Sequence, residues 1–370
     1  MTACGDHIRD LIGSSGPISV EHYMEIALGH PTLGYYMTRD PFGASGDFIT
    51  APEVSQIFGE LLGLWCVDYW ARMGAPGRVQ LVELGPGRGT LMRDALRAAR
   101  VVPAFLAAVE VALVETSPTL RAAQKTALAG VAPPVAWFGG VEDIPGGPMI
   151  ALANEFFDAL PARQYVKTSE GWRERVIGLD GRGELSFGAA PRVHESIEES
   201  IEANAPDGAI LERNLVAERV MFTLAKRVAK RGGAVLAIDY GHVKSGVGDT
   251  LQAMRRHEFV DALAEPGEAD LTTHVDFEAL ARAAARAGAL TRGPVTQGLF
   301  LNRLGAGERA RKLAAGADAA AARRIMSELT RLTAGGRLDK VGMGGLFKAL
   351  AVTQDGGPEP IGFSENLASP

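Results

Sequence analysis

The sequence has little cysteine and no excess of positive charge. Its only cysteines are Cys4 and Cys66, which form no C-x-x-C pair, so the composition excludes a disulfide framework and predicts a reducing compartment, the cytoplasm. With 38 basic and 44 acidic residues, the formal net charge is −6. This balance is unfavourable for neutralising nucleic-acid phosphates, and we expect no nucleic-acid partner.

Long hydrophobic runs are also missing. The longest, such as residues 234–238, are far shorter than the ~18 apolar residues that a membrane-spanning helix needs, so we expect no integral membrane segment. Residues 1–15 lack the apolar stretch of a signal peptide and are too acidic for a transit peptide, which predicts no targeting segment. The histidines show no metal-ligand spacing, and we expect no metal.

The first 75 residues have a mostly helical character. Thr50 and Glu53 stand at capping-box spacing before an apolar stripe of helical period, which predicts a helix from about residue 52 to residue 73. Residues 31–50 are rich in glycine and aromatic side chains, as long functional loops are. We expect this loop to be a lid that closes over the site and excludes water.

From residue 78 onward, short apolar runs alternate with segments of helical period. This alternation predicts an α/β fold with a mostly parallel, doubly wound sheet. Strands are expected at 79–84, 109–114, 135–138, 149–153 and 234–238, with a helix near 277–287 and a closing pair at 295–302 and 347–353.

Residues 162–231 are too long and too strand-like for one crossover. Runs at 164–168, 172–178 and 184–187, separated by turns, predict an inserted β-meander followed by a helix at about 211–230. The expected organisation is a helical N-terminal region with a lid loop (1–75), a cofactor-binding half (76–160), a β-rich insertion (161–230), a second half (231–353) and a tail (354–370).

A glycine-rich turn, Glu83 to Thr90, joins an expected strand to an expected helix. Glycines let the backbone turn sharply and approach a ligand, and the N–H groups of the following helix attract an anionic group. The spacing is G-x-G-x-G, not the G-x-G-x-x-G of dinucleotide sites. Glu83 precedes the first glycine by two residues, where its charge does not help a pyrophosphate but attracts an ammonium or a sulfonium.

A second acidic residue, Glu115, ends the next expected strand. From this position a carboxylate can accept hydrogen bonds from both hydroxyls of a ribose. The combined pattern favours S-adenosylmethionine over NAD. The expected cofactor-binding residues are Glu83, Gly85, Gly87, Gly89 and Glu115, with Asn154 from the next motif.

The motif Asn154 to Pro161 follows the expected strand at 149–153. Open parallel sheets bind their substrates at the carboxyl ends of the strands. Carboxylates there can orient a cationic nitrogen nucleophile, and we favour this role for Glu155 over the alternative of helix capping. For Phe156 and Phe157 we favour packing in the core.

Together these motifs resemble the MidA-type family, which includes a mitochondrial assembly factor for respiratory complex I. The resemblance covers residues 34–36, 46–53, 83–90, 115–118, 154–161, 238–241, 248–253, 269–277 and 296–298. It implies a class I methyltransferase (Rossmann-like) fold, S-adenosyl-L-methionine as cofactor, and methylation of an arginine in a protein substrate. For the mitochondrial member, that substrate is a quinone-site subunit of NADH:ubiquinone oxidoreductase. Without a visible presequence, this chain resembles a bacterial member.

An arginine substrate needs carboxylates, because a guanidinium must be held in line with the sulfonium methyl group. The acidic residues in motif positions are Asp47, Glu53, Glu155 and Asp158. We expect Glu155, Asp158 and Asp47 to be catalytic, and which two form the clamp stays open. A noncatalytic assembly chaperone and a small-molecule methyltransferase are the alternative functions. The sequence also leaves the oligomeric state open, a homodimer being one possibility.

Overall fold

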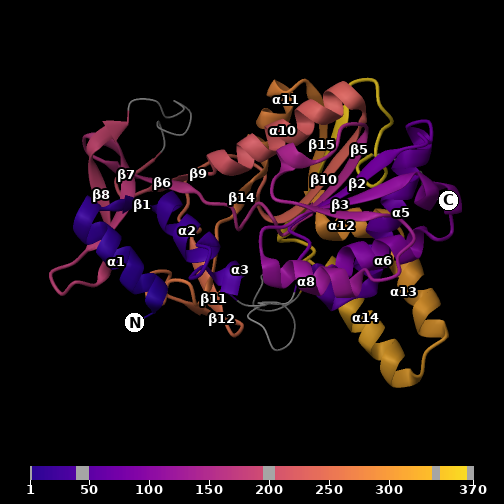
Figure 1. The fold of residues 1–370 in the computed structure, drawn as a ribbon, viewed down its shortest axis with the longest axis horizontal. Coiled ribbons are helices and arrows are strands. Elements are labelled where there is room, and N and C mark those ends of the chain that lie inside the picture. Colours follow the sequence, from indigo (N-terminus) through magenta and orange to yellow (C-terminus); the bar gives the residue numbers. More distant parts are fainter. Residues whose placement is uncertain (1, 39–49, 195–204, 336–341, 365–370) are drawn as a thin grey trace. The chain divides into compact units, whose positions relative to one another are not determined.

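The computed structural model describes residues 2–38, 50–194, 205–335 and 342–364 (Figure 1). The chain divides into two compact units, each made of three stretches. The large unit contains residues 49–157, 220–241 and 280–370, and the small unit contains residues 1–48, 158–219 and 242–279. These units do not follow the segment boundaries expected at 75, 160 and 230, because residues distant in the sequence pack into one core.

A mostly parallel sheet forms the centre of the large unit (Figure 1). Strands β5 and β2 lie at its middle and are buried along their whole length, as expected for parallel strands covered on both faces. β16 is antiparallel to both β10 and β15, while the other neighbouring pairs are parallel. The order is β15 (Ala289–Thr296), β16 (Phe347–Gln354), β10 (Gly233–His242), β5 (Met149–Asn154), β2 (Val79–Leu84), β3 (Val109–Val114) and β4 (Val135–Phe138).

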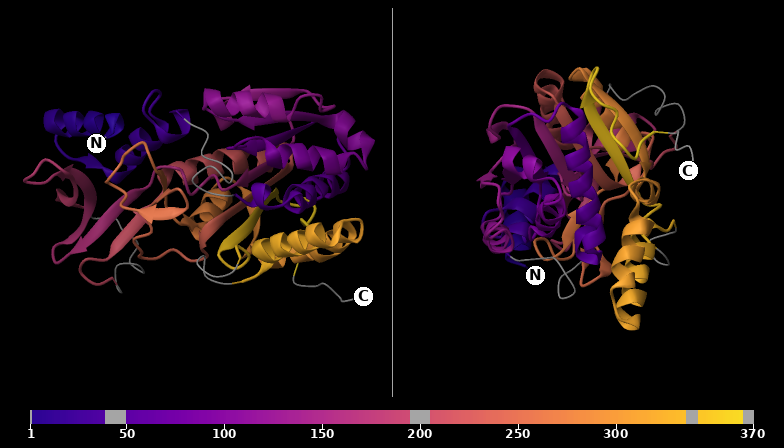
Figure 2. Two further views of the ribbon diagram at one scale, coloured as in Figure 1. Left: turned by 90° about the horizontal axis from the view of Figure 1, so that it is seen from below. Right: turned by 90° about the vertical axis from the view of Figure 1, so that its right-hand side faces the viewer.

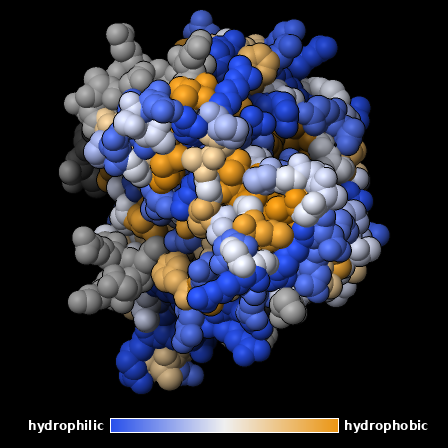
Figure 3. Space-filling model, turned by 90° about the vertical axis from the view of Figure 1, so that its left-hand side faces the viewer, coloured by the Kyte–Doolittle hydropathy of each residue, from blue (hydrophilic) through white to orange (hydrophobic). Residues whose placement is uncertain are grey.

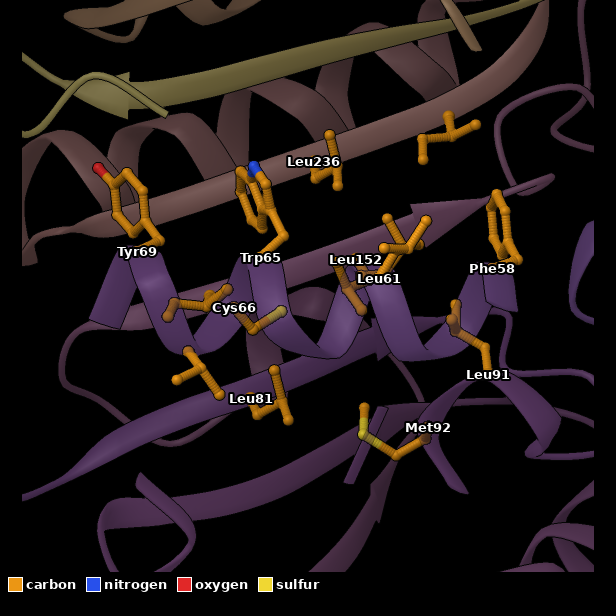
Figure 4. Packing of buried hydrophobic residues seen from close by; sticks show 14 of the residues in the cluster. Phe58, Leu61, Trp65, Cys66, Tyr69, Leu81, Leu91, Met92, Leu152 and Leu236 are labelled. Carbon is orange, nitrogen blue, oxygen red and sulfur yellow. The ribbon is translucent and has the colours of Figure 1, made fainter. Parts of the chain in front are cut away.

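Helix α5 (Gln56–Arg72) packs against this sheet and against α6 (Thr90–Ala99). Its residues Phe58, Leu61, Trp65 and Tyr69 belong to the same hydrophobic cluster as Leu152 and Leu236 of the strands (Figure 4). Gly63 allows close contact with α6, since a Cβ there would lie 2.4 Å from the Ala95 carbonyl oxygen. The remaining helices are α7 (Pro103–Ala108), α8 (Pro118–Ala127), α10 (Leu215–Arg231), α11 (Phe277–Arg286), α12 (Gln297–Arg303), and the adjacent α13 (Ala306–Ala315) and α14 (Ala319–Thr333) (Figure 2).

Two antiparallel sheets characterise the small unit. One has the order β1-β7-β6-β9 with β8 also paired to β7, and the other has the order β12-β11-β13. The three strands expected between residues 164 and 187 are present as β6, β7 and β8. The elements are α1 (Ala3–Ser15), β1 (Ile18–Ser19), α2 (Val20–Gly29), α3 (Tyr35–Thr38), β6 (Arg163–Thr168), β7 (Gly171–Leu179), β8 (Leu185–His194), β9 (Ile210–Arg213), β11 (Gln252–Arg255), β12 (Glu258–Val260), β13 (Asp270–Thr272) and β14 (Val275–Asp276).

Three expected elements differ from the structure. The helix expected from residue 211 begins at Leu215, because residues 210–213 pair with β6 as a strand and the Asn214 carboxamide caps the helix at Ala217 N. The strand expected at 295–302 is wrong beyond Thr296, whose hydroxyl accepts from Leu299 N and caps α12. The helix expected at 52–73 is broken at Ser55 into α4 (Ala51–Val54) and α5.

The surface mixes polar and apolar side chains. On the face shown in Figure 3, hydrophobic residues form several groups separated by hydrophilic ones. Among the described residues, the helices are too short or too polar for any of them to span a bilayer.

Candidate functional site

The order of the central sheet reverses between β2 and β5. From β2 the chain moves outward through β3 and β4, and it then returns to β5 on the other side of β2. Loops after neighbouring strands diverge at such a point, and open α/β sheets bind ligands in the crevice between them. Residues 85–89 follow β2 and residues 155–157 follow β5 at this position. The two motifs identified in the sequence therefore meet at one edge of the sheet.

The glycine-rich turn has a backbone that other residues rarely adopt. Gly85, Gly87 and Gly89 have φ angles of 59°, 52° and 84°. A Cβ at Gly85 would also lie 3.0 Å from Cδ2 of Phe156. Gly89 is the N-cap of α6 and provides no side-chain cap, so this end of the helix suits an anionic group of a ligand.

Glu83 has a buried carboxyl group beneath this turn. The residue is 3% exposed, and its Oε2 atom has no hydrogen-bond partner among the described residues. Burial raises the pKa of Glu83 well above its ordinary value, the backbone N–H of Met92 opposes this rise, and the nearby Glu115 carboxyl adds to it. An unpartnered buried oxygen is costly, so this site fits a ligand that supplies a cation or an N–H donor.

Asn154 presents a second unpartnered acceptor at the end of β5. Its Nδ2 atom donates to Glu155 Oε1 at 3.1 Å, whereas its Oδ1 atom is buried without a partner among the described residues. Glu83 and Asn154 therefore offer acceptor oxygens from adjacent strands. These two unpartnered acceptors suit the cationic methionine portion of S-adenosylmethionine.

Glu115, just beyond β3, is held by a network that the sequence analysis missed. Its carboxylate accepts from Ser117 N at 2.8 Å and from Gln124 Nε2 at 3.2 Å. The same Gln124 amide donates to the Gly87 carbonyl at 2.8 Å and accepts from Trp137 Nε1 at 2.8 Å. Gln124 thus joins the glycine turn to the predicted ribose acceptor. A lone glutamine in an amphipathic helix carries no sequence signal for such a role.

The turn after β5 is strained and tightly held. Glu155 has a φ angle of 50°, which costs a non-glycine residue ~1 kcal/mol or more. Its Oε1 atom accepts at 2.9 Å from the backbone N–H of Ala51, the first residue of α4. Asp239, fully buried in β10, accepts from the backbone N–H groups of Phe156 and Phe157 at 3.1 and 3.0 Å. Phe157 is buried, as favoured from the sequence.

The other predicted catalytic acids are not brought beside Glu155 within the large unit. Asp158 is buried in the small unit, and Asp47 lies outside the described residues, as does most of the expected lid at 31–50. In the small unit, Tyr36 Oη donates to Asp270 Oδ1 at 2.6 Å. Burial raises the pKa of Tyr36 well above its ordinary value, and the Asp270 and Asp158 carboxylates contribute. Sequence reasoning assigned no role to Tyr36 or Asp270.

Metal binding has no support in the described part of the chain, where no cluster of three or more His, Cys, Asp or Glu side chains could hold an ion.

Comparisons with known proteins agree with this geometry. Residues 61–295 match the family described as "Putative S-adenosyl-L-methionine-dependent methyltransferase". The Drosophila melanogaster "Protein arginine methyltransferase NDUFAF7 homolog, mitochondrial" is 40% identical over 375 aligned positions, covering 93% of this chain and 83% of the relative. The Danio rerio protein arginine methyltransferase NDUFAF7 is 38% identical over 338 positions, covering 84% and 79%.

A solved structure supports the same conclusion. The crystal structure of a likely methyl transferase from Burkholderia thailandensis, bound to S-adenosyl-homocysteine, matches this chain with a TM-score of 0.84 and 29% identity. The match covers 98% of this chain and 95% of that one. The fold and the two loops at the switch point of the sheet therefore define a class I methyltransferase whose cofactor is S-adenosylmethionine. This chain belongs to the S-adenosyl-L-methionine-dependent methyltransferase family named above, and the family resemblance found in the sequence is confirmed.

The cytoplasmic location expected from the sequence is corrected by these comparisons. The fish, frog, fly and human relatives are all mitochondrial proteins. Low cysteine content is therefore no basis for assigning the cytoplasm, because it indicates a reducing environment without naming the compartment.

Proposed function

We propose that this protein transfers a methyl group from S-adenosylmethionine to an arginine of a partner protein. The buried and unpartnered Oε2 atom of Glu83 at the sheet's switch point is the observation that carries the proposal, because it suits a cationic cofactor. The arginine acceptor is supported by the relatives, which are protein arginine methyltransferases by name. We further propose that the partner is a subunit of respiratory complex I, met during assembly.

The cofactor site consists of residues from three neighbouring strands and the loops that follow them. Glu83 and Asn154 hold the cationic methionine portion, and the turn with Gly85, Gly87 and Gly89 lets the backbone approach it. Glu115, oriented by Gln124, accepts from the ribose hydroxyls. The bound cofactor supplies an electrophilic sulfonium methyl group.

Carboxylates provide the substrate side of the site. Glu155 stands at the rim of the sheet in a strained backbone conformation, as residues at functional sites often do. It holds the arginine guanidinium so that one nitrogen faces the methyl group. A carboxylate of the site, or water, would take up the proton that the guanidinium nitrogen loses on methylation.

Mass spectrometry of cells with and without the gene tests the proposal. We expect loss of arginine methylation on a complex I subunit, restored by the wild-type protein but not by Gly87→Val. Restored complex I assembly with Gly87→Val would instead indicate a noncatalytic chaperone. An unchanged arginine methylation pattern, accompanied by loss of a methylated metabolite, would indicate a small-molecule methyltransferase.

A further inference from the structure

The short helix α4 (Ala51–Val54) contacts the two loops that follow β2 and β5 in the large unit. On one side, the hydroxyl of Thr90, the first residue of α6, donates to Glu53 Oε1 at 2.5 Å. On the other side, Ala51 N donates to Glu155 Oε1 at 2.9 Å. Thr90 ends the glycine-rich motif after β2, and Glu155 begins the turn after β5. Four residues of α4 therefore connect the two loops between which the cofactor binds.

The position of α4 is fixed by packing as well as by these two contacts. Ala51 is fully buried, and Ser55 has an extended backbone that ends α4 before α5 begins. α5 is in turn seated on α6, where a Cβ on Gly59 would lie 2.7 Å from the Asp94 Cβ. This packing leaves α4 little freedom to shift unless Thr90 or Glu155 moves with it.

A simpler role for Glu53 is to cap α6. A carboxylate near a helix N-terminus is stabilising in any protein, and Gly89 supplies no side-chain cap of its own. A cap alone predicts an effect on folding stability and no effect on cofactor binding by the folded protein. The contact between Ala51 and Glu155 lies outside this explanation, because it connects the same short helix to the turn after β5.

We propose that Glu53 is a positioning residue that acts through Thr90 and α4 to set the spacing between the two loops of the cofactor crevice. This inference rests on the proposed cofactor site. Since α4 is hydrogen-bonded to both loops, ordering of α4 and binding of the cofactor are thermodynamically linked. Cofactor binding slows local opening of α4, and loosening of α4 weakens cofactor binding by the same factor.

Titration calorimetry with S-adenosylhomocysteine tests this linkage in the full-length protein. We expect Thr90→Val and Glu53→Ala each to raise Kd about tenfold, the order of one hydrogen bond to a charged group. The double variant should be no weaker than the weaker single variant, because both changes remove the same contact. Glu53→Gln keeps an acceptor for Thr90 and should recover part of the affinity. Thr126→Val, which removes a hydroxyl bonded within α8 to the Ala122 carbonyl, is the matched control and should bind like wild type.

Hydrogen exchange of residues 51–55 gives an independent readout. In the wild-type protein, S-adenosylhomocysteine should slow exchange there, and in Thr90→Val this slowing should be largely lost. If the Glu53 and Thr90 variants have lower thermal midpoints but unchanged Kd and unchanged hydrogen exchange, the inference is overturned and Glu53 is a helix cap. Additive losses of cofactor affinity in the double variant would also overturn it. If the wild-type protein itself does not bind S-adenosylhomocysteine, the proposed function fails as well, which separates the two outcomes.

Discussion

Replacing Glu83 by glutamine should change folding stability and cofactor affinity in opposite directions. In the cofactor-free protein, burial raises the pKa of Glu83 well above its ordinary value of about 4.3. The folded state therefore holds a proton that the unfolded chain has released. The stability contributed by this group is complete below about pH 4.3 and is lost as the pH rises towards the raised pKa, by at most ~1.4 kcal/mol per pH unit. Glutamine does not ionise, so the folding stability of the Glu83→Gln variant does not fall in this way as the pH rises.

The cofactor reverses the preference of the group. A sulfonium or an ammonium beside Glu83 favours the ionised carboxylate, so binding releases a proton. Wild-type affinity should rise with pH, by at most tenfold per unit, until the raised pKa is reached. Glu83→Gln should bind the cofactor about 10- to 100-fold more weakly at pH 8, as expected for a hydrogen bond to a charged group worth ~1.5–3 kcal/mol. Its cofactor affinity should also depend less on pH than that of the wild type.

Calorimetry between pH 5 and pH 8 and thermal melts of the same preparations measure both effects. S-adenosylmethionine and S-adenosylhomocysteine should be compared. Equal losses of affinity for the two ligands place Glu83 beside the ammonium that they share, whereas a loss of affinity for S-adenosylmethionine alone places it beside the sulfonium. Glu110→Gln is the control, since it removes a β3 carboxylate that is bonded to Arg78 and Gln80. Equal affinity and equal pH slope in Glu83→Gln and the wild type would refute the assignment of Glu83 to the cofactor.

Three further substitutions test other parts of the site. Gly87→Val places a β-branched residue at a φ angle of 52°, and a folded variant that binds S-adenosylmethionine like wild type in calorimetry would show that the turn is only structural. Glu115→Ala should cost ~1–3 kcal/mol of cofactor affinity, measured in the same assay. Glu155→Gln keeps an acceptor for Ala51 N, so cofactor affinity should hold while single-turnover methyl transfer to an arginine peptide falls ~10²-fold. If Glu155 only caps α4, the variant loses at most ~1 kcal/mol of stability and keeps its turnover.

The sequence was sufficient for most of the central sheet and for the cofactor class, while the edge strand β15 was expected too late in the chain. Strands β2 and β5 are mostly apolar and buried along their whole length, and the glycines directly after β2 form a local pattern whose backbone requirement does not depend on the rest of the fold. Local signals failed where tertiary pairing competes with helix period. Residues 210–213 have a pattern that predicts the start of a helix, yet they form β9 because they pair with the edge of β6.

Only the tertiary structure decided which polar groups meet. Thr50 and Glu53 stand at capping-box spacing, yet Thr50 makes no capping hydrogen bond and Glu53 bonds to Thr90, 37 residues away. Gln124 reaches Gly87, Glu115 and Trp137 for the same reason: helices packed on a sheet bring side chains together by their position in space. Sequence spacing reports contacts within one element or turn, whereas the hydrogen bonds that orient this site cross between elements and depend on how those elements pack.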